Sequence, residues 1–351
     1  MKDLIQRRNY SLDIIRIVAV LAVVMIHCCA PFVLYYEPHT VEFAFGNLFD
    51  SIARVGVPLF LMISGALFLD ERKEITLKSI ISKHVKSLAI ITIVWAIIYS
   101  IVYNVFDSLL EGDTISISDT ITGIVEGHLH MWYLYMIMGI YVITPFLRKF
   151  VNKESPQMAV YFVTISFVVQ FLLPAVNEIC IQHLGFDYIG TWINQFQLDF
   201  FGGYVTYYLV GWYIVHVGIK HNYLKYIVYF LGLSSLIYII FYVHFTGDFG
   251  SAYEYIGLPV FLYSISVFLI LNNLRFNFTE KAIKIISGFS KLSFGTYIVH
   301  MIVLSVFIKV FPYSEHCVLY LFACFVTVTC TSFLCTYVMS KIPLLKGLVK
   351  M

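Results

Sequence analysis

Residues 11–35 read SLDIIRIVAVLAVVMIHCCAPFVLY. Every residue between Arg16 and His27 is apolar, and the whole stretch is long enough to cross a hydrocarbon core of about 30 Å as an α-helix. Similar apolar runs recur along the chain, so this stretch decides the fold class. We expect a transmembrane helix here and a chain built from such helices.

The composition of the chain supports the same fold class. Of 351 residues, 60% are hydrophobic and 13% are charged, and the mean hydropathy is +0.84. Soluble domains have about 25% charged and 45–50% apolar residues, so this chain has too little polar surface to cover a body in water. These values exclude a soluble enzyme, a disordered chain and a nucleic-acid binder.

Apolar runs of spanning length predict an all-α polytopic membrane protein with about ten transmembrane helices. Short polar stretches separate the runs, and we expect one membrane domain over residues 1–351 with no appended soluble domain. The predicted spans are residues 14–35, 48–69, 85–106, 130–147, 157–176, 201–219, 223–245, 254–274, 293–312 and 317–340.

The basic residues predict which side each loop occupies. All but four of the 23 lysines and arginines fall in the two terminal segments or in alternate loops, whereas the loops between them are acidic. Cytoplasmic loops of membrane proteins carry an excess of lysine and arginine, so both termini are predicted to be cytoplasmic. The four exceptions, inside or bordering spans, are Arg16, Arg54, Lys86 and Lys309.

Three ionisable residues of the first span share one helix face. Arg16 and His27 are eleven residues apart, which is three helical turns plus about 20°. Asp13 precedes Arg16 by three residues and falls on the same stripe. Ionisable residues in a span are costly and commonly face a cavity or a partner, so this face is the first candidate for function.

Each of these residues also has a structural interpretation. Asp13 complements the positive end of the helix dipole, Arg16 can extend to lipid phosphates at the cytoplasmic interface, and His27 can be a packed core residue. His300 lies within the predicted ninth span, where functional and structural roles are both open. The seven cysteines form no C-x-x-C pair, so neither a disulfide framework nor a metal site is predicted.

Two further groups have mainly structural interpretations. Asp50 and Arg54 are four residues apart and predict a local ion pair at the outer end of span two. His128 and His130 precede Trp132 at the outer end of span four. An aromatic belt explains Trp132 and Tyr133. A metal site made from the two histidines is not expected, since it would lack a third ligand.

Four segments, taken in order, resemble the acyltransferase-3 family of membrane acyltransferases. The hallmark of that family is an arginine and a histidine separated by ten residues and preceded by Leu-Asp, as in the first span here. The sequence is most similar to the enterobacterial common antigen O-acetyltransferase group within it. The resembling segments are 11–27, 54–65 (RVGVPLFLMISG), 130–149 (beginning HMWYLY) and 293–300 (SFGTYIVH).

The resemblance implies an acyltransferase of the bacterial cytoplasmic (inner) membrane. The implied donor is acetyl-CoA or another acyl-CoA in the cytoplasm, and the implied acceptor is a hydroxyl of an envelope glycan or lipid-linked sugar. Many relatives have an Arg-x-x-Arg pair at the start of the third helix, where this chain has Lys83 and Lys86. Lysine can hold a phosphate as a point charge but lacks the bidentate fork of arginine.

The implied chemistry assigns a role to each candidate. His27 is the predicted general base, and Arg16 binds the donor phosphates together with Lys83 and Lys86. Asp13 orients Arg16, and His300 is a second acid/base group or a structural partner. Transfer through an acyl-His27 intermediate and direct transfer are both open.

A transporter or flippase for a lipid-linked sugar or small anion is the alternative class. By composition, ten spans with buried charge fit a transporter as well as they fit an acyltransferase. The sequence shows no inverted repeat, however, which is evidence against a transporter. A purely structural or sensory membrane protein is a third class, and it leaves the alignment of Arg16 with His27 unexplained.

Overall fold

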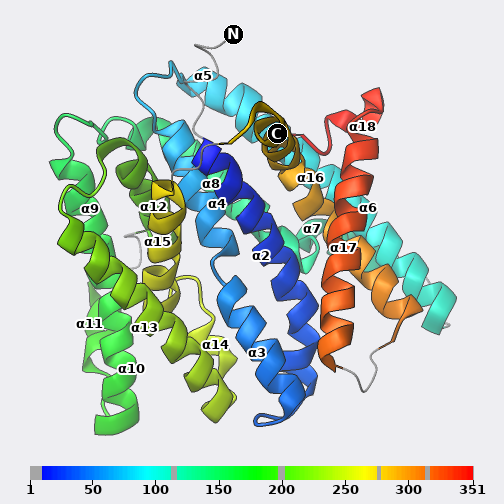
Figure 1. The fold of residues 1–351 in the computed structure, drawn as a ribbon, viewed down its shortest axis with the longest axis horizontal. Helices are drawn as coiled ribbons and strands as arrows, with labels where there is room; N and C mark the ends of the chain where they lie inside the picture. The colour runs from blue at the N-terminus through cyan, green and yellow to red at the C-terminus, as the bar shows by residue number, and fades with distance from the viewer. Residues whose placement is uncertain (1–9, 112–116, 197–201, 275–277, 313–316, 351) are drawn as a thin grey trace. The chain divides into compact units, whose positions relative to one another are not determined.

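The computed structural model describes residues 10–111, 117–196, 202–274, 278–312 and 317–350 (Figure 1). All regular secondary structure in these ranges is helical. The N-terminal basic residues Lys2, Arg7 and Arg8, which carry part of the sidedness prediction, lie outside the described residues.

Eight helical segments in the described ranges are long and apolar enough to cross a membrane, which confirms the predicted fold class. Each overlaps one of the predicted spans. They are Tyr10–Tyr35, Val41–Phe68, Leu77–Asn104, Ile117–Leu147, Gln157–Leu184, Asn222–Thr246, Glu280–Val310 and Val318–Met339.

The other two predicted spans are shorter helices. The predicted span 254–274 contains the 16-residue helix α15, Leu258–Asn273. The predicted span 201–219 contains α12, Gly203–Trp212, which continues as the π-helical segment η5, Tyr213–Val217. At a rise of about 1.5 Å per residue, neither reaches the roughly 30 Å of a full hydrocarbon core.

The helices pack as two compact units. Unit 1 comprises Met1–Lys73 and Phe146–Ser287. Its helices are α2 (Tyr10–Tyr35), α3 (Val41–Ala53), α4 (Gly56–Phe68), α9 (Gln157–Phe167), the π-helical η3 (Val168–Leu172), α10 (Leu173–Leu184), α11 (Tyr188–Gln195), α12, η5, α13 (Asn222–Thr246), α14 (Phe249–Ala252) and α15.

Unit 2 comprises Glu74–Pro145 and Gly288–Met351. The chain passes between the units three times: between Lys73 and Glu74, within α8 and within α16, whose first residues up to Ser287 belong to unit 1. The helices of unit 2 are α5 (Leu77–Ser79), the π-helical η1 (Ile80–Val85), α6 (Lys86–Glu111), α7 (Ile117–Glu126), the 3₁₀-helical η2 (Leu129–Met131), α8 (Trp132–Leu147), α16 (Glu280–Val310), α17 (Cys317–Met339) and α18 (Pro343–Lys346).

Exposed apolar side chains form stripes along two helices, and these stripes mark the helix faces that can contact lipid. On α6 the exposed side chains Ile90, Ile93, Ile97 and Ile101 recur at helical spacing. The helix α13 has a similar stripe, formed by Phe230, Leu233, Ile237, Phe241 and Phe245. Such continuous apolar surface is unfavourable in water, whereas hydrocarbon tails cover it at no cost.

Small residues allow a close helix crossing in unit 1. The helix α2 packs against α3 and α4, and α12 packs against α4. Gly65 of α4 lies over the backbone of Tyr208, and Gly211 of α12 lies over the backbone of Met62. A Cβ at either glycine would overlap main-chain atoms of the opposite helix, so the two glycines allow the approach reciprocally.

We expect Gly211→Ala to destabilise the protein by about 1–3 kcal/mol, because the added methyl group forces α12 away from α4. Thermal unfolding of the purified protein in detergent measures the loss. Gly139→Ala is the control, since a Cβ at Gly139 on α8 meets no atom within 4 Å. Equal unfolding temperatures for the two variants would contradict this account of the crossing.

Candidate functional site

Arg16 and His27 lie on one uninterrupted helix, α2. Their eleven-residue separation corresponds to about 16 Å along the helix axis. The Arg16 side chain is 29% exposed, and His27 is half-buried. The helix therefore carries a guanidinium near its first turns and an imidazole three turns further along, as the sequence predicts.

Asp13 lies beside Arg16. Asp13 is buried, and its Oδ1 lies 3.9 Å from Nη1 of Arg16. The hydroxyl of Ser287, on α16, donates to Oδ2 of Asp13 over 3.4 Å. The carboxylate is thus held between α16 and the guanidinium, a position suited to orienting Arg16.

Arg16 and Asp13 line a pocket of about 630 Å³ in unit 1. The loop that follows α4 forms one wall, and the end of α12 with η5 forms another. The lining residues are Leu12, Asp13, Arg16, Ala66, Leu67, Asp70, Glu71, Arg72, Lys73, Lys153, Trp212, Val215 and His216.

The pocket lining is rich in charge of both signs. It contains four lysine or arginine side chains and three carboxylates, so the cations are in excess by one when His216 is neutral. A bound anion would therefore find several charge-assisted donors close together. The cations are Arg16, Arg72, Lys73 and Lys153.

Asp70 and Arg72 form a bidentate ion pair at the pocket wall. Nε of Arg72 is 2.9 Å from Oδ1 and Nη2 is 3.0 Å from Oδ2. Burial alone would raise the pKa of Asp70, but the hydrogen bonds from the side chain and backbone of Arg72 outweigh it and lower the pKa. Asp70 is thus held as a carboxylate that fixes the turn after α4.

Three side chains, two cationic and one an imidazole, form hydrogen bonds with the last carbonyls of α4. Nη1 of Arg148 donates to the Phe68 carbonyl over 2.5 Å. Nζ of Lys73 donates to Leu67 over 3.0 Å, and Nε2 of His216 lies 2.8 Å from the carbonyl of Ala66. The final carbonyls of a helix have no partner within the helix and carry partial negative charge, so these groups satisfy them.

Arg148 also fixes the loop beyond α4. It donates to the carbonyl of Asp70 over 3.1 Å and to that of Lys73 over 2.6 Å. Burial lowers the pKa of Lys73, and the charges of Arg72, Arg148 and Arg16 lower it further, against the attraction of Asp70. An anion in the pocket would favour the charged form of Lys73 and raise that pKa.

We expect Arg148→Ala to lower the free energy of unfolding by about 2 kcal/mol, because three carbonyls lose a charged donor. Arg148→Lys should recover only part of this, since a point charge cannot replace the guanidinium fork. Thermal unfolding in detergent measures both effects, with Lys149→Ala as the exposed neighbouring control. A loss in Lys149→Ala as large as in Arg148→Ala would contradict the assignment.

Lys83 and Lys86 are not among the residues that line this pocket. Both lie in unit 2, Lys83 within η1 and Lys86 at the start of α6, and both are exposed. Their predicted part in donor binding stays a prediction. Arg72, Lys73 and Lys153 are pocket cations that fall among the basic residues of the predicted cytoplasmic loops, where charge alone did not distinguish them.

His300 belongs to a buried cluster in unit 2. Its ring is edge-on to that of His130, with centroids 5.3 Å apart, and its Nδ1 lies 2.5 Å from the carbonyl of Tyr297. Nδ1 of His128 is 2.8 Å from Nδ1 of His130. The contact of His130 with His300 joins segments far apart in the sequence, where only a metal site at His128 and His130 had been considered and judged improbable.

Tyrosines complete the histidine cluster. The hydroxyl of Tyr297 donates to the carbonyl of His130 over 2.6 Å, and the ring of Tyr99 stacks on His128 at 4.7 Å. Within the described part of the chain, no group of three or more His, Cys, Asp and Glu residues is placed to hold a metal ion. The cluster is therefore a network of imidazoles and phenols.

Asp50 and Arg54 form the predicted local ion pair, but deep in unit 1. Nη2 of Arg54 is 2.5 Å from Oδ1 of Asp50, and the two side chains are only 15% and 2% exposed. The guanidinium carbon lies 4.0 Å from the centroid of the Tyr253 ring. The pair lies where α3 ends and α4 begins, at the break between the two helices that form span two.

The fold and the sequence together define a polytopic membrane acyltransferase. The sequence matches an acyltransferase domain over residues 9–337, nearly the whole chain, and the chain belongs to the acyltransferase-3 family. The chain has no significant match among curated proteins or among solved structures.

Proposed function

We propose that this acyltransferase moves an acetyl group from acetyl-CoA to a hydroxyl of an envelope glycan in the bacterial inner membrane. The observation that carries the proposal is the pocket in which Arg16 lies among three further cations, on the helix that also holds His27. The choice of acetyl donor and glycan acceptor follows the resemblance of the sequence segments to the enterobacterial common antigen O-acetyltransferase group, which is itself part of the proposal.

The phosphates of the donor would bind at the cationic pocket. Arg16, Arg72 and Lys153 provide charge-assisted donors there, and Asp13 limits the orientations open to Arg16. The flexible pantetheine arm is long enough to cover the roughly 16 Å that separate Arg16 from His27 along α2. Lys83 and Lys86 remain secondary candidates for phosphate contact. Both termini are proposed to lie in the cytoplasm.

His27 would act as the general base. It takes the proton of the acceptor hydroxyl while that oxygen attacks the thioester carbonyl carbon. The new ester C–O bond forms, the C–S bond breaks, and the proton leaves with the CoA thiol. A thioester is already activated, so the protein needs to supply orientation, one base and stabilisation of the oxyanion.

His300 is proposed as a second acid/base group. A backbone carbonyl can only accept, so Nδ1 of neutral His300 carries the proton shared with Tyr297. Nε2 is then the atom of His300 that can gain a proton. The contact with His130 orients the ring that would do so.

We expect His27→Ala to lower the rate of CoA release from acetyl-CoA by about 100-fold or more, the usual contribution of a general base. Purified protein in nanodiscs, supplied with an envelope-glycan acceptor and a thiol reagent, measures the release. His221→Ala, at an exposed histidine just before α13, is the matched control. Full activity of folded His27→Ala protein would overturn the proposal, and so would substrate movement across proteoliposomes without CoA release.

We expect a strain lacking the gene to lose O-acetyl groups from one envelope glycan. Mass spectrometry of the purified glycans measures this as the loss of one acetyl group from each modified sugar. Restoration by the wild-type gene but not by His27→Ala ties the change to the proposed base. Unchanged acetylation of every envelope glycan would contradict the choice of acceptor.

A further inference from the structure

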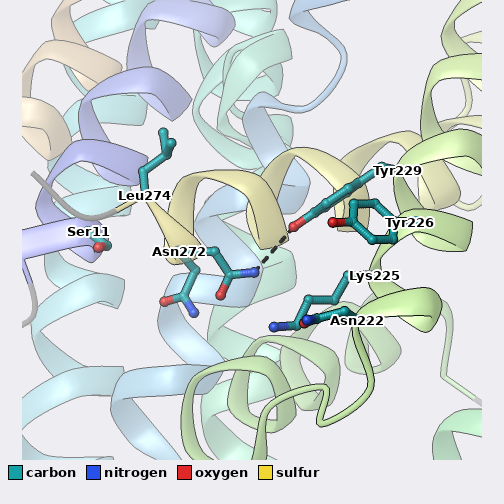
Figure 2. A pocket seen from close by; sticks show the side chains of 8 residues that line it. Ser11, Asn222, Lys225, Tyr226, Tyr229, Asn272 and Leu274 are labelled. Atoms are coloured by element: carbon teal, nitrogen blue, oxygen red, sulfur yellow. Dashed lines mark hydrogen bonds between the residues drawn. The ribbon is translucent and has the colours of Figure 1, made fainter.

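A second pocket of about 430 Å³ lies in unit 1, outside the donor site (Figure 2). It lies where α2 and α13 begin and where α15 ends. The lining residues are Ser11 of α2; Asn222, Lys225, Tyr226 and Tyr229 of α13; and Asn272, Asn273 and Leu274 at the end of α15.

The pocket is at a boundary between apolar and polar surface. The helices α2 and α13 are both long enough to span a membrane, so their first turns lie near a lipid headgroup layer. Tyr223 and Tyr226, in the first turns of α13, are 60% and 69% exposed. Exposed tyrosines at span ends are typical of the membrane interface.

The apolar stripe of α13 starts directly beside the pocket, at the residue that follows Tyr229. Phe230 is 69% exposed and begins the series of exposed side chains that continues along the helix. A molecule in the pocket could therefore place a polar head among the lining residues and an apolar tail along α13.

The lining offers many hydrogen-bond donors and one positive charge. Among the described residues that line it, none is acidic, and Lys225 is the one lysine or arginine. The side-chain amide of Asn273 donates to the hydroxyl of Tyr229 over 3.3 Å, the dashed line in Figure 2. A hydroxyl that accepts one hydrogen bond can still donate its own proton, so Tyr229 adds to the amide and hydroxyl donors.

Such a set of donors suits a phosphate with a single negative charge. Its oxygens accept hydrogen bonds from amides and hydroxyls, and Lys225 neutralises the charge. One lysine near a membrane surface contributes only about 1 kcal/mol, too little to retain a small soluble phosphate. A tail against the stripe of α13 would supply the missing binding energy through apolar contact.

We propose that this pocket binds the phosphodiester headgroup of an anionic membrane phospholipid. Lys225 pairs with the phosphate, the asparagine amides and tyrosine hydroxyls donate to its oxygens, and an acyl chain follows the exposed face of α13. Because Ser11 is two residues before Asp13 on α2, a bound lipid also holds the end of the helix that lines the donor pocket. This site goes beyond the proposed function and does not depend on it.

The test titrates the purified full-length protein with phosphatidylglycerol or zwitterionic phosphatidylcholine, with bound lipid counted by native mass spectrometry. We expect phosphatidylglycerol to bind more tightly, and Lys225→Ala to weaken that binding about fivefold, the effect of one lysine near an anionic surface. Lys220→Ala, an exposed lysine outside the pocket, should leave it unchanged. Lys225→Arg keeps the positive charge, so this variant should retain most of the preference for phosphatidylglycerol over phosphatidylcholine. It is the control for a loss of binding caused by substitution alone.

Three results would overturn the proposal. The first is equal binding of the two lipids by the wild-type protein. The second is equal affinity in Lys225→Ala and Lys220→Ala, which places the lipid elsewhere. The third is displacement of phosphatidylglycerol by glycerol phosphate at matched concentrations, which would make the ligand a soluble phosphate.

Discussion

The end of α4 is the constraint around which the pocket lined by Arg16 is built. A helix that ends near a membrane leaves carbonyls that water cannot freely satisfy. Here Arg148, Lys73 and His216 satisfy them, and Arg148 also holds the next turn of chain. The same loop carries Arg72 and Asp70 into the pocket that Arg16 lines. One backbone requirement therefore concentrates positive charge next to the first span.

The glycine crossing of α4 and α12 supports this arrangement at the same end of α4. Gly65 and Gly211 let the two backbones approach closely, and His216 reaches Ala66 from η5, which continues α12. The loop that carries Arg72 and Lys73 therefore starts from a helix in tight contact with α12, so these two charges can be held in place before a substrate arrives.

Much of the fold could be predicted from the sequence, because a span is a local property of about 20 residues. The spacing of Arg16 and His27 was informative for the same reason, since both lie on one helix. Contacts between distant segments were not predictable. Nothing local indicates that His130 packs against His300, or that Arg148 binds the end of α4. The ion pair of Asp50 and Arg54 was predicted, but the contact of Arg54 with Tyr253, about 200 residues further along the chain, was not predictable.

The central claim is that the donor phosphates bind at the pocket formed by Arg16 and the loop after α4. Its most direct test is a cryo-electron microscopy structure of the protein in nanodiscs with a non-hydrolysable acetyl-CoA analogue. We predict phosphate density within hydrogen-bond distance of Arg16, Arg72 or Lys153, with the acyl end directed along α2 toward His27. Phosphate density that contacts none of these three residues would contradict the account.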